Sequence, residues 1–258
     1  MWRCDVGIRR SSRNLVIGTW DDHDYGLNDG GEEYPYKRES QQLLYDFLGT
    51  SKDAPERFRD GVYNSRVIDF DGKKVKVIVL DTRFFRTAVT KAVNSKKRLQ
   101  PNPYGQGTIL GEAQWKWLEQ ELNASDAQFN VIVSSIQLVS DQHGFECWGN
   151  FPHEIDKLEK MLVASKAKGT FIISGDRHIA TFSSKKVTNL NYPLIDFTSS
   201  GLTHVYSSFS GEENRYQIGK VVADKNFGLL QFDFTNNRVI MQIRGLENKL
   251  FGEHIQQY

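Results

Sequence analysis

Three carboxylates surround one imidazole within four consecutive residues near the start of the chain. They follow the short apolar run Leu15–Trp20 and are Asp21, Asp22, His23 and Asp24. Carboxylates packed this closely repel one another, and a divalent or trivalent cation relieves that repulsion. The segment is therefore either a metal site or a fully solvated acidic turn, and its residues alone leave both open. A calcium EF-hand is excluded because no glycine stands where that loop requires one.

A second pair of metal-ligand types follows another apolar run. Asp176 and His178 come just after Thr170–Ser174, which the pattern predicts to be a buried strand. Carboxylate oxygen and imidazole nitrogen are the usual ligands of iron, manganese and zinc in hydrolytic sites, and ligands converge at strand ends in α/β folds. An Asp-capped turn with a surface histidine explains this pair equally well. Two such clusters in one chain favour a two-metal centre, in which a metal-bound hydroxide attacks a phosphoryl group.

Composition and charge exclude several classes of protein. The 258 residues include 33 basic and 32 acidic side chains, so no basic field drives nucleic-acid binding and any phosphate recognition must be local. Two distant cysteines, Cys4 and Cys147, exclude a disulfide framework but leave one long-range disulfide open. No apolar stretch approaches the ~20 residues of a membrane helix, and the first residues lack a secretion signal. The sequence therefore predicts a folded domain of unassigned compartment.

The elements that must position these residues alternate between strands and helices over the first two thirds of the chain. Helical spacing predicts helices over 36–48, 112–122 and 154–167, and a short one opening at Pro55. Between them we expect a long basic loop over 84–110. Strands are expected over 15–20, 61–70, 73–80, 129–135, 170–174, 194–198, 216–222, 227–234 and 239–244. The economical architecture is α/β, a mixed sheet with helices outside, in one domain over 15–258 after an irregular segment 1–14.

Five segments resemble the PhoD-like (alkaline phosphatase D) metallophosphatases of the calcineurin-like metallophosphoesterase superfamily. They are Val16–Asp29, Leu80–Arg83, Ile109–Leu118, Ser134–Gln137 and Ser174–His178, and W-D-D-H-D-Y-G within the first is the most specific. The resemblance implies an αββα sandwich of two mixed sheets flanked by helices. It also implies metal-dependent hydrolysis of a small-molecule phosphate mono- or diester by a metal-bound hydroxide. The metals it implies are iron together with calcium, although manganese or zinc would suit the same ligand types.

The same resemblance assigns roles to individual residues. Asp22, Asp176 and His178 would be metal ligands. His23 would be the catalytic histidine, acting as general acid or as hydrogen-bond donor to the phosphoryl group, with Asp24 holding its ring. Residues expected to contact substrate or to support the metal ligands are Asp21, Asn28, Asp29, Arg83 and Gln137.

Several of these side chains have a structural alternative. Arg177, placed in the catalytic set, and Arg83 stand beside strand ends and could clamp phosphate oxygens in bidentate fashion. Structural ion pairs explain both arginines equally well. Asn28 and Asp29 could bind calcium or simply cap the loop.

The chain departs from the family pattern upstream of Leu15. The family carries there a strand-end Cys or Asp and a G-D-x-x-Y element whose aspartate bridges the metals, and neither is found. We therefore expect too few metal ligands for tight binding. The alternative function is a truncated, catalytically inactive metallophosphatase-fold protein that acts as a binding module or has no independent role.

Overall fold

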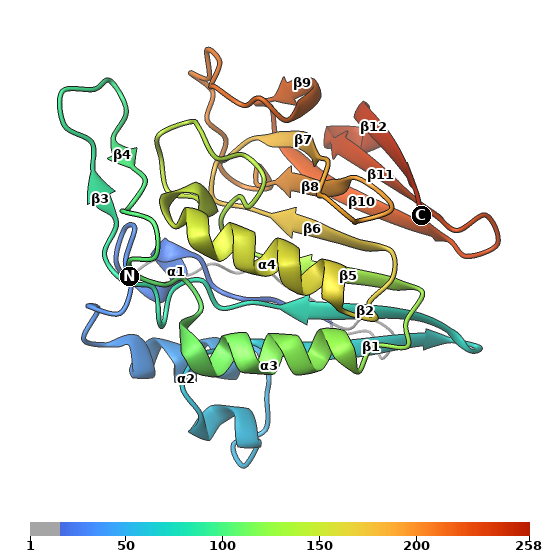
Figure 1. Cartoon of the computed structure of the whole chain (residues 1–258), viewed down its shortest axis with the longest axis horizontal. Helices are drawn as coiled ribbons and strands as arrows, with labels where there is room; N and C mark the ends of the chain where they lie inside the picture. The colour runs from blue at the N-terminus through green and yellow to red at the C-terminus, as the bar shows by residue number, and fades with distance from the viewer. Residues whose placement is uncertain (1–15) are drawn as a thin grey trace.

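A mixed sheet of seven strands runs through the centre of the computed structural model, which describes residues 16–258 (Figure 1). The strands are β1 (Asn64–Phe70), β2 (Lys73–Val79), β5 (Phe129–Val133), β6 (Thr170–Ser174), β7 (Ala180–Lys185), β8 (Leu194–Ser199) and β9 (Gln217–Val222). Their order in the sheet is β1-β2-β5-β6-β8-β7-β9. β2, β5, β6 and β8 are parallel, so their carboxyl ends meet at one edge of the sheet. β1 and β7 run antiparallel to their neighbours.

β1 and β2 form the hairpin that Asp71-Gly72 predicts. Phe70 pairs with Lys73 across a two-residue turn in which Asp71 and Gly72 have φ of 53° and 84°. Positive φ at both central residues is the turn geometry that matches the twist of antiparallel strands. The predicted hairpin over 61–80 is confirmed.

Two long helices pack on one face of the seven-stranded sheet. α3 (Gly111–Asn123) and α4 (Pro152–Ala164) bury apolar stripes spaced at helical periodicity against β2, β5 and β6 (Figure 1). The buried cluster includes Trp115, Leu118, Leu122, Ile155 and Leu158 from the helices and Ile78, Ile132 and Ile172 from the strands. Burial of each such side chain stabilises the fold by about 1.5–3 kcal/mol before the entropy cost. The predicted helices at 112–122 and 154–167 are confirmed, with slightly shifted ends.

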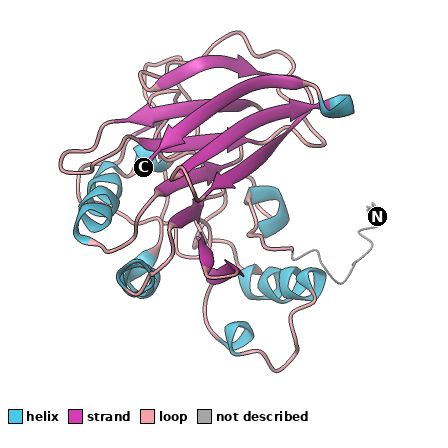
Figure 2. Ribbon diagram, turned by 90° about the vertical axis from the view of Figure 1, so that its right-hand side faces the viewer, coloured by secondary structure: helices cyan, strands magenta, loops and turns pink. Residues whose placement is uncertain are grey.

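A smaller antiparallel sheet covers part of the opposite face. It consists of β10 (Asn226–Asp233), β11 (Arg238–Gly245) and β12 (Leu250–Gln257), in that order. Val239, Met241 and Ile243 of β11 are buried with Phe129, Phe171 and Phe197 of the large sheet. Figure 2 shows the long strands gathered together with most of the helices outside them. The predicted α/β architecture with a mixed sheet flanked by helices is confirmed, and the second sheet is antiparallel rather than mixed.

The segment before the first long strand contains three helical elements. They are α1 (Asp22–Tyr25), α2 (Lys37–Leu48) and the 3₁₀ turn η1 (Pro55–Phe58), so the predicted helices at 36–48 and Pro55 are confirmed. The strand predicted over 15–20 is wrong for its described part, because residues 16–20 are extended without pairing to a described strand. Trp20 instead packs in a cluster with Tyr25, Tyr45 and Phe84.

Smaller differences from expectation lie in loops and polar strands. Within 84–110, two short strands, β3 (Thr90–Lys91) and β4 (Leu99–Gln100), pair with each other. Elsewhere in the described chain there are two more 3₁₀ turns, η2 (Trp148–Asn150) and η3 (Leu246–Asn248). β7 and β12 were not predicted. Cys147 is a buried free thiol, whereas Cys4 and the segment 1–14 lie outside the described residues. From residue 16 onward, no helix has the length and apolar character needed to cross a bilayer.

Candidate functional site

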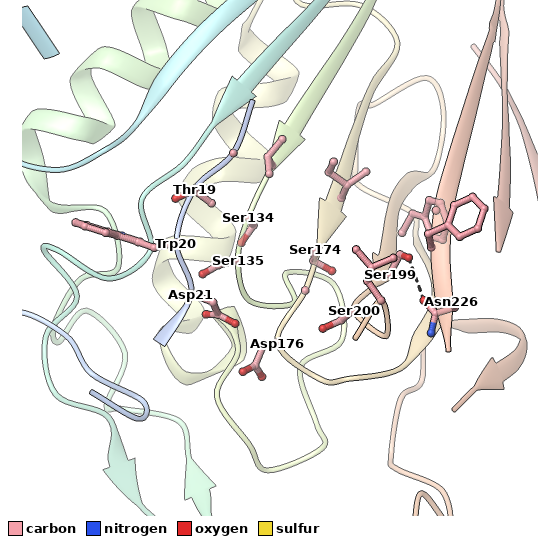
Figure 3. A pocket seen from close by; sticks show the side chains of 18 of the residues that line it. Thr19, Trp20, Asp21, Ser134, Ser135, Ser174, Asp176, Ser199, Ser200 and Asn226 are labelled. Carbon is pink, nitrogen blue, oxygen red and sulfur yellow. Dashed lines mark hydrogen bonds between the residues drawn. The ribbon is translucent and has the colours of Figure 1, made fainter. Parts of the chain in front are cut away.

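Three carboxylates meet at the carboxyl edge of the parallel strands. Asp21 and Asp22 stand at the start of α1, and Asp176 follows β6. One ligand oxygen from each lies within 4.8 Å of the others. Figure 3 shows Asp21 and Asp176 side by side at one end of a cavity. The structure therefore brings together Asp22 and Asp176, two of the three expected metal ligands, and adds Asp21.

The electrostatics of this cluster favour a cation. Burial and, after it, the nearby charges of Asp21 and Glu146 together raise the pKa of Asp176 to about 8. Burial also raises the pKa of Asp21, although Arg83 opposes this change. Neighbouring carboxylates resist ionisation because their negative charges repel. Their ionisation becomes favourable when a positive ion binds to their oxygens. An all-oxygen donor set of this kind fits a hard cation such as calcium, manganese or ferric iron.

A tight turn after β6 presents Asp176 to the cluster. Asp176 and His178 both adopt left-handed φ, 68° and 53°, which is uncommon for residues with side chains. The turn is closed by the backbone N–H of Arg177, which donates to Gly175 O at 2.8 Å. Asp and His are among the residue types that tolerate this conformation, which occurs both in turns and at functional sites.

Asp22 also organises the loop that follows it. Its carboxylate accepts the backbone N–H of His23 at 2.7 Å and that of Asp29 at 3.0 Å. The His23 side chain is 77% exposed, and its Nε2 lies 3.9 Å from Asp22 Oδ1. Asp24, the expected partner of His23, instead accepts the backbone N–H of Asp21 at 3.5 Å. The structure therefore places Asp22, rather than Asp24, beside the His23 ring.

Arg83 is engaged in ion pairs. It has no exposed surface, and its Nε and Nη2 donate to Asp21 while its Nη1 donates to Glu146. Glu146 also lies 2.8 Å from Arg86 Nε. Arg83 therefore forms structural ion pairs, as the alternative interpretation expects. Its guanidinium holds Asp21 in place, and the nitrogens that bind Asp21 and Glu146 are not free to bind phosphate. Glu146 carried no recognisable sequence signal, because it lies in a loop without periodic pattern.

Arg177 is also paired, although less completely. Its Nη2 contacts Glu212, and its guanidinium lies 3.9 Å from the centre of the Phe145 ring. Its buried Nε has no hydrogen-bond partner. The recorded contacts of Arg177 are those of a structural ion pair.

The remaining predicted residues lie around the cluster rather than in it. Asp29 pairs with Arg98, and Asn28 is exposed without a hydrogen bond to any described residue. Gln137 is buried and donates through Nε2 to Thr198 Oγ1 at 2.8 Å. The His178 side chain lies outside the cluster formed by the three carboxylates. Its ring contacts the ring of His204, a residue that sequence reasoning missed.

A cavity of about 500 Å³ opens beside the carboxylates. Asp21, Asp24 and Asp176 are among its lining residues. Serine side chains from the ends of β5, β6 and β8 follow, and apolar side chains of the same strands and of β10 line the rest (Figure 3). The cavity is large enough for a small organic phosphate beside the carboxylate cluster.

The fold and this site define an α/β domain with a candidate cation-binding cluster at the carboxyl edge of its parallel strands. A family model described as PhoD-like phosphatase matches residues 58–243, and the chain belongs to this family. The matched range includes Arg83, Gln137, Asp176 and His178, whereas Asp21–Asp29 precede it.

Individual relatives are distant. Alkaline phosphatase D of Bacillus subtilis (strain 168) is 21% identical over 212 residues, which is 72% of this chain and 35% of that protein. A solved structure of PhoD matches with a TM-score of 0.68 at 17% identity, covering 93% of this chain and 51% of that one. GAP50, described as the anchor in the inner membrane complex of Plasmodium, matches with a TM-score of 0.51 at 14% identity, covering 85% and 61%. This chain thus spans about a third of the curated relative and half of the solved PhoD chain.

Proposed function

We propose that this chain hydrolyses phosphate esters in a metal-dependent reaction. The observation that carries the proposal is the partly buried cluster of Asp21, Asp22 and Asp176 in a member of the PhoD-like phosphatase family. The substrate is a small-molecule mono- or diester. The proposed metals are iron together with calcium, with manganese or zinc as substitutes at the same ligand types.

Each proposed residue role follows from where its side chain lies. Asp22 and Asp176 are the proposed carboxylate ligands, and Asp21 supports them from its ion pair with Arg83. His178, which lies in the same turn as Asp176 but outside the three-carboxylate cluster, is the proposed imidazole ligand. When bound, the metal polarises the phosphoryl oxygen and activates water as the nucleophile. His23 presents an exposed imidazole beside Asp22, where it donates a proton or a hydrogen bond to the ester. Asp22 is then the carboxylate that orients the His23 ring.

One preparation tests this proposal. The chain of 258 residues is loaded separately with iron plus calcium, manganese or zinc, and bound metal is measured after dialysis. Turnover of p-nitrophenyl phosphate and bis-p-nitrophenyl phosphate is then compared with that of Asp176→Asn. Retained metal with turnover that Asp176→Asn abolishes supports the proposal. Absence of both metal and turnover contradicts it.

A second candidate function is a non-catalytic binding module with the same fold. The observation that favours it is the small number of ligands, because the clustered carboxylates number three among residues 16–258 and one of them is paired with Arg83. A fold relative, GAP50, is described as the anchor in the inner membrane complex of Plasmodium. A folded chain that retains no metal and turns over neither ester supports this alternative.

A further inference from the structure

His204 joins the site from a loop that sequence reasoning did not single out. The ring centroids of His178 and His204 lie 4.9 Å apart with an interplanar angle of 77°. This is the edge-to-face arrangement that aromatic rings prefer. It is the one ring contact recorded for His178 among residues 16–258.

The loop that carries His204 is fastened to the backbone of His178. Ser200 Oγ accepts the His178 N–H at 3.2 Å, and the N–H of Tyr206 donates to His178 O at 2.9 Å. The loop is also held at its start, where Gly201 O accepts the N–H of Asn226 at 2.9 Å. Hydrogen bonds on both sides of His178 therefore place the His204 ring against it even though His204 is exposed.

His178 needs an external support of this kind. Its backbone is left-handed, with φ 53°, and it lies in the turn after β6 rather than within a strand or helix. A metal-ligating histidine is generally held by a second group that orients its ring, and loss of that group typically costs 10–100-fold in metal affinity. Among residues 16–258, no hydrogen bond or ion pair joins the His178 ring to another group, and the His204 ring is the one ring that packs against it.

We propose that His204 is a positioning residue, whose ring sets the orientation of the His178 imidazole for metal binding. The inference rests on the proposed function, in which His178 is a metal ligand. It assigns to His204 no contact with substrate and no proton transfer. Ring packing is the whole of its role, so a phenyl ring should replace it.

The test compares the full chain with His204→Ala and His204→Phe. His153→Ala is the matched control, because His153 makes a similar edge-to-face contact with Tyr104 at 5.8 Å on another part of the surface. Mn²⁺ affinity is measured by calorimetry, and the His178 ring proton signals are measured by NMR without metal. His204→Ala should weaken Mn²⁺ binding about 10–100-fold and shift the His178 signals. His204→Phe and His153→Ala should keep the affinity of the parent chain.

Where the parent chain binds Mn²⁺, either of two affinity results would overturn the inference. If His204→Ala binds Mn²⁺ as tightly as the parent chain, His204 does not position the ligand. If His204→Phe is as weak as His204→Ala, a nitrogen of His204 is required and ring packing is not its role. A parent chain that binds no Mn²⁺ contradicts the proposed function instead, and the NMR comparison then decides the inference. In that case, His178 signals unchanged in His204→Ala would overturn it.

Discussion

The guanidinium of Arg83 holds the carboxylate of Asp21 from below the surface, with Nε 3.1 Å from Oδ1. Asp21 therefore enters the carboxylate cluster already paired with a buried cation, which fixes where its oxygens point. The same guanidinium contacts Glu146, so one arginine joins the start of α1 to the loop before η2. This contact couples the stability of the domain to the geometry of its candidate metal site.

Arg83→Met should destabilise the domain strongly. The change leaves Glu146 buried with Arg86 as its remaining partner, and it removes the support of Asp21. Loss of one partner of a buried ion pair typically costs about 3–5 kcal/mol. The free energy of unfolding, measured in urea at pH 7, checks this expectation.

Arg215→Met is the matched control, because Arg215 also pairs with an aspartate, Asp141, but is 55% exposed. Exposed pairs contribute about 0–1 kcal/mol, so this variant should unfold close to the parent chain. Equal losses in the two variants would contradict the structural role given to Arg83.

His23→Ala should lower turnover without lowering stability. The side chain is 77% exposed and its nearest charged neighbour, Asp22, keeps its backbone hydrogen bonds when the ring is removed. A lost general acid typically costs 10²–10⁴-fold in rate. Turnover of p-nitrophenyl phosphate, bound metal and the unfolding midpoint are measured together. Normal turnover in this variant would remove His23 from the proposed mechanism.

The convergence of Asp22 and Asp176 could be expected from the sequence, because Asp176 follows a buried parallel strand and Asp22 belongs to a recognisable acidic cluster. The hairpin at Asp71-Gly72 was equally predictable from its turn chemistry. Both depend on local signals. The contacts of Arg83 with Glu146 and of His178 with His204 depend on how irregular loops fold back, and no periodic pattern encodes that.

The missed strands have a related physical explanation. β12 has a single buried residue, Gln256, and also carries Glu253 and His254, so it lacks the apolar pattern of a core strand. β7 is largely buried, but Thr181, Ser183 and Ser184 interrupt its apolar pattern. Both strands form because β11 and β8 offer backbone partners. Conversely, residues 16–20 have β-type side chains without a described partner strand, and no strand forms there.

His143 should make the domain less stable in acid. Burial lowers the pKa of its imidazole to about 3, with Arg177 and Lys97 contributing. Between the ordinary pKa near 6.5 and about pH 3, the unfolded chain therefore binds a proton that the folded chain does not. Stability falls as pH drops through this window, by at most about 1.4 kcal/mol per pH unit from this residue. His143→Gln should remove that slope, as measured by urea unfolding from pH 7 to 4, and an unchanged slope would contradict the assignment.

Metal binding should strengthen with pH until Asp176 has lost its proton. Burial, with a smaller contribution from the charges of Asp21 and Glu146, raises the pKa of Asp176 to about 8. The folded metal-free chain keeps a proton on Asp176 that the unfolded chain releases near pH 4. The free energy of unfolding of the metal-free chain therefore falls as pH rises from about 4 to 8. A metal ion must displace the same proton, and the Mn²⁺ association constant should rise about tenfold per pH unit below pH 8 and level off above it.

Asp176→Asn should bind Mn²⁺ weakly at pH 8.5 and with a flatter pH dependence, because it has lost both a ligand and the competing proton. Asp233→Asn is the control, since Asp233 pairs with Arg238 on the small sheet and should leave both affinity and slope unchanged. Calorimetry from pH 6 to 9 measures the association constants. If the parent chain and Asp176→Asn show the same slope, the proton that competes with the metal is not held by Asp176.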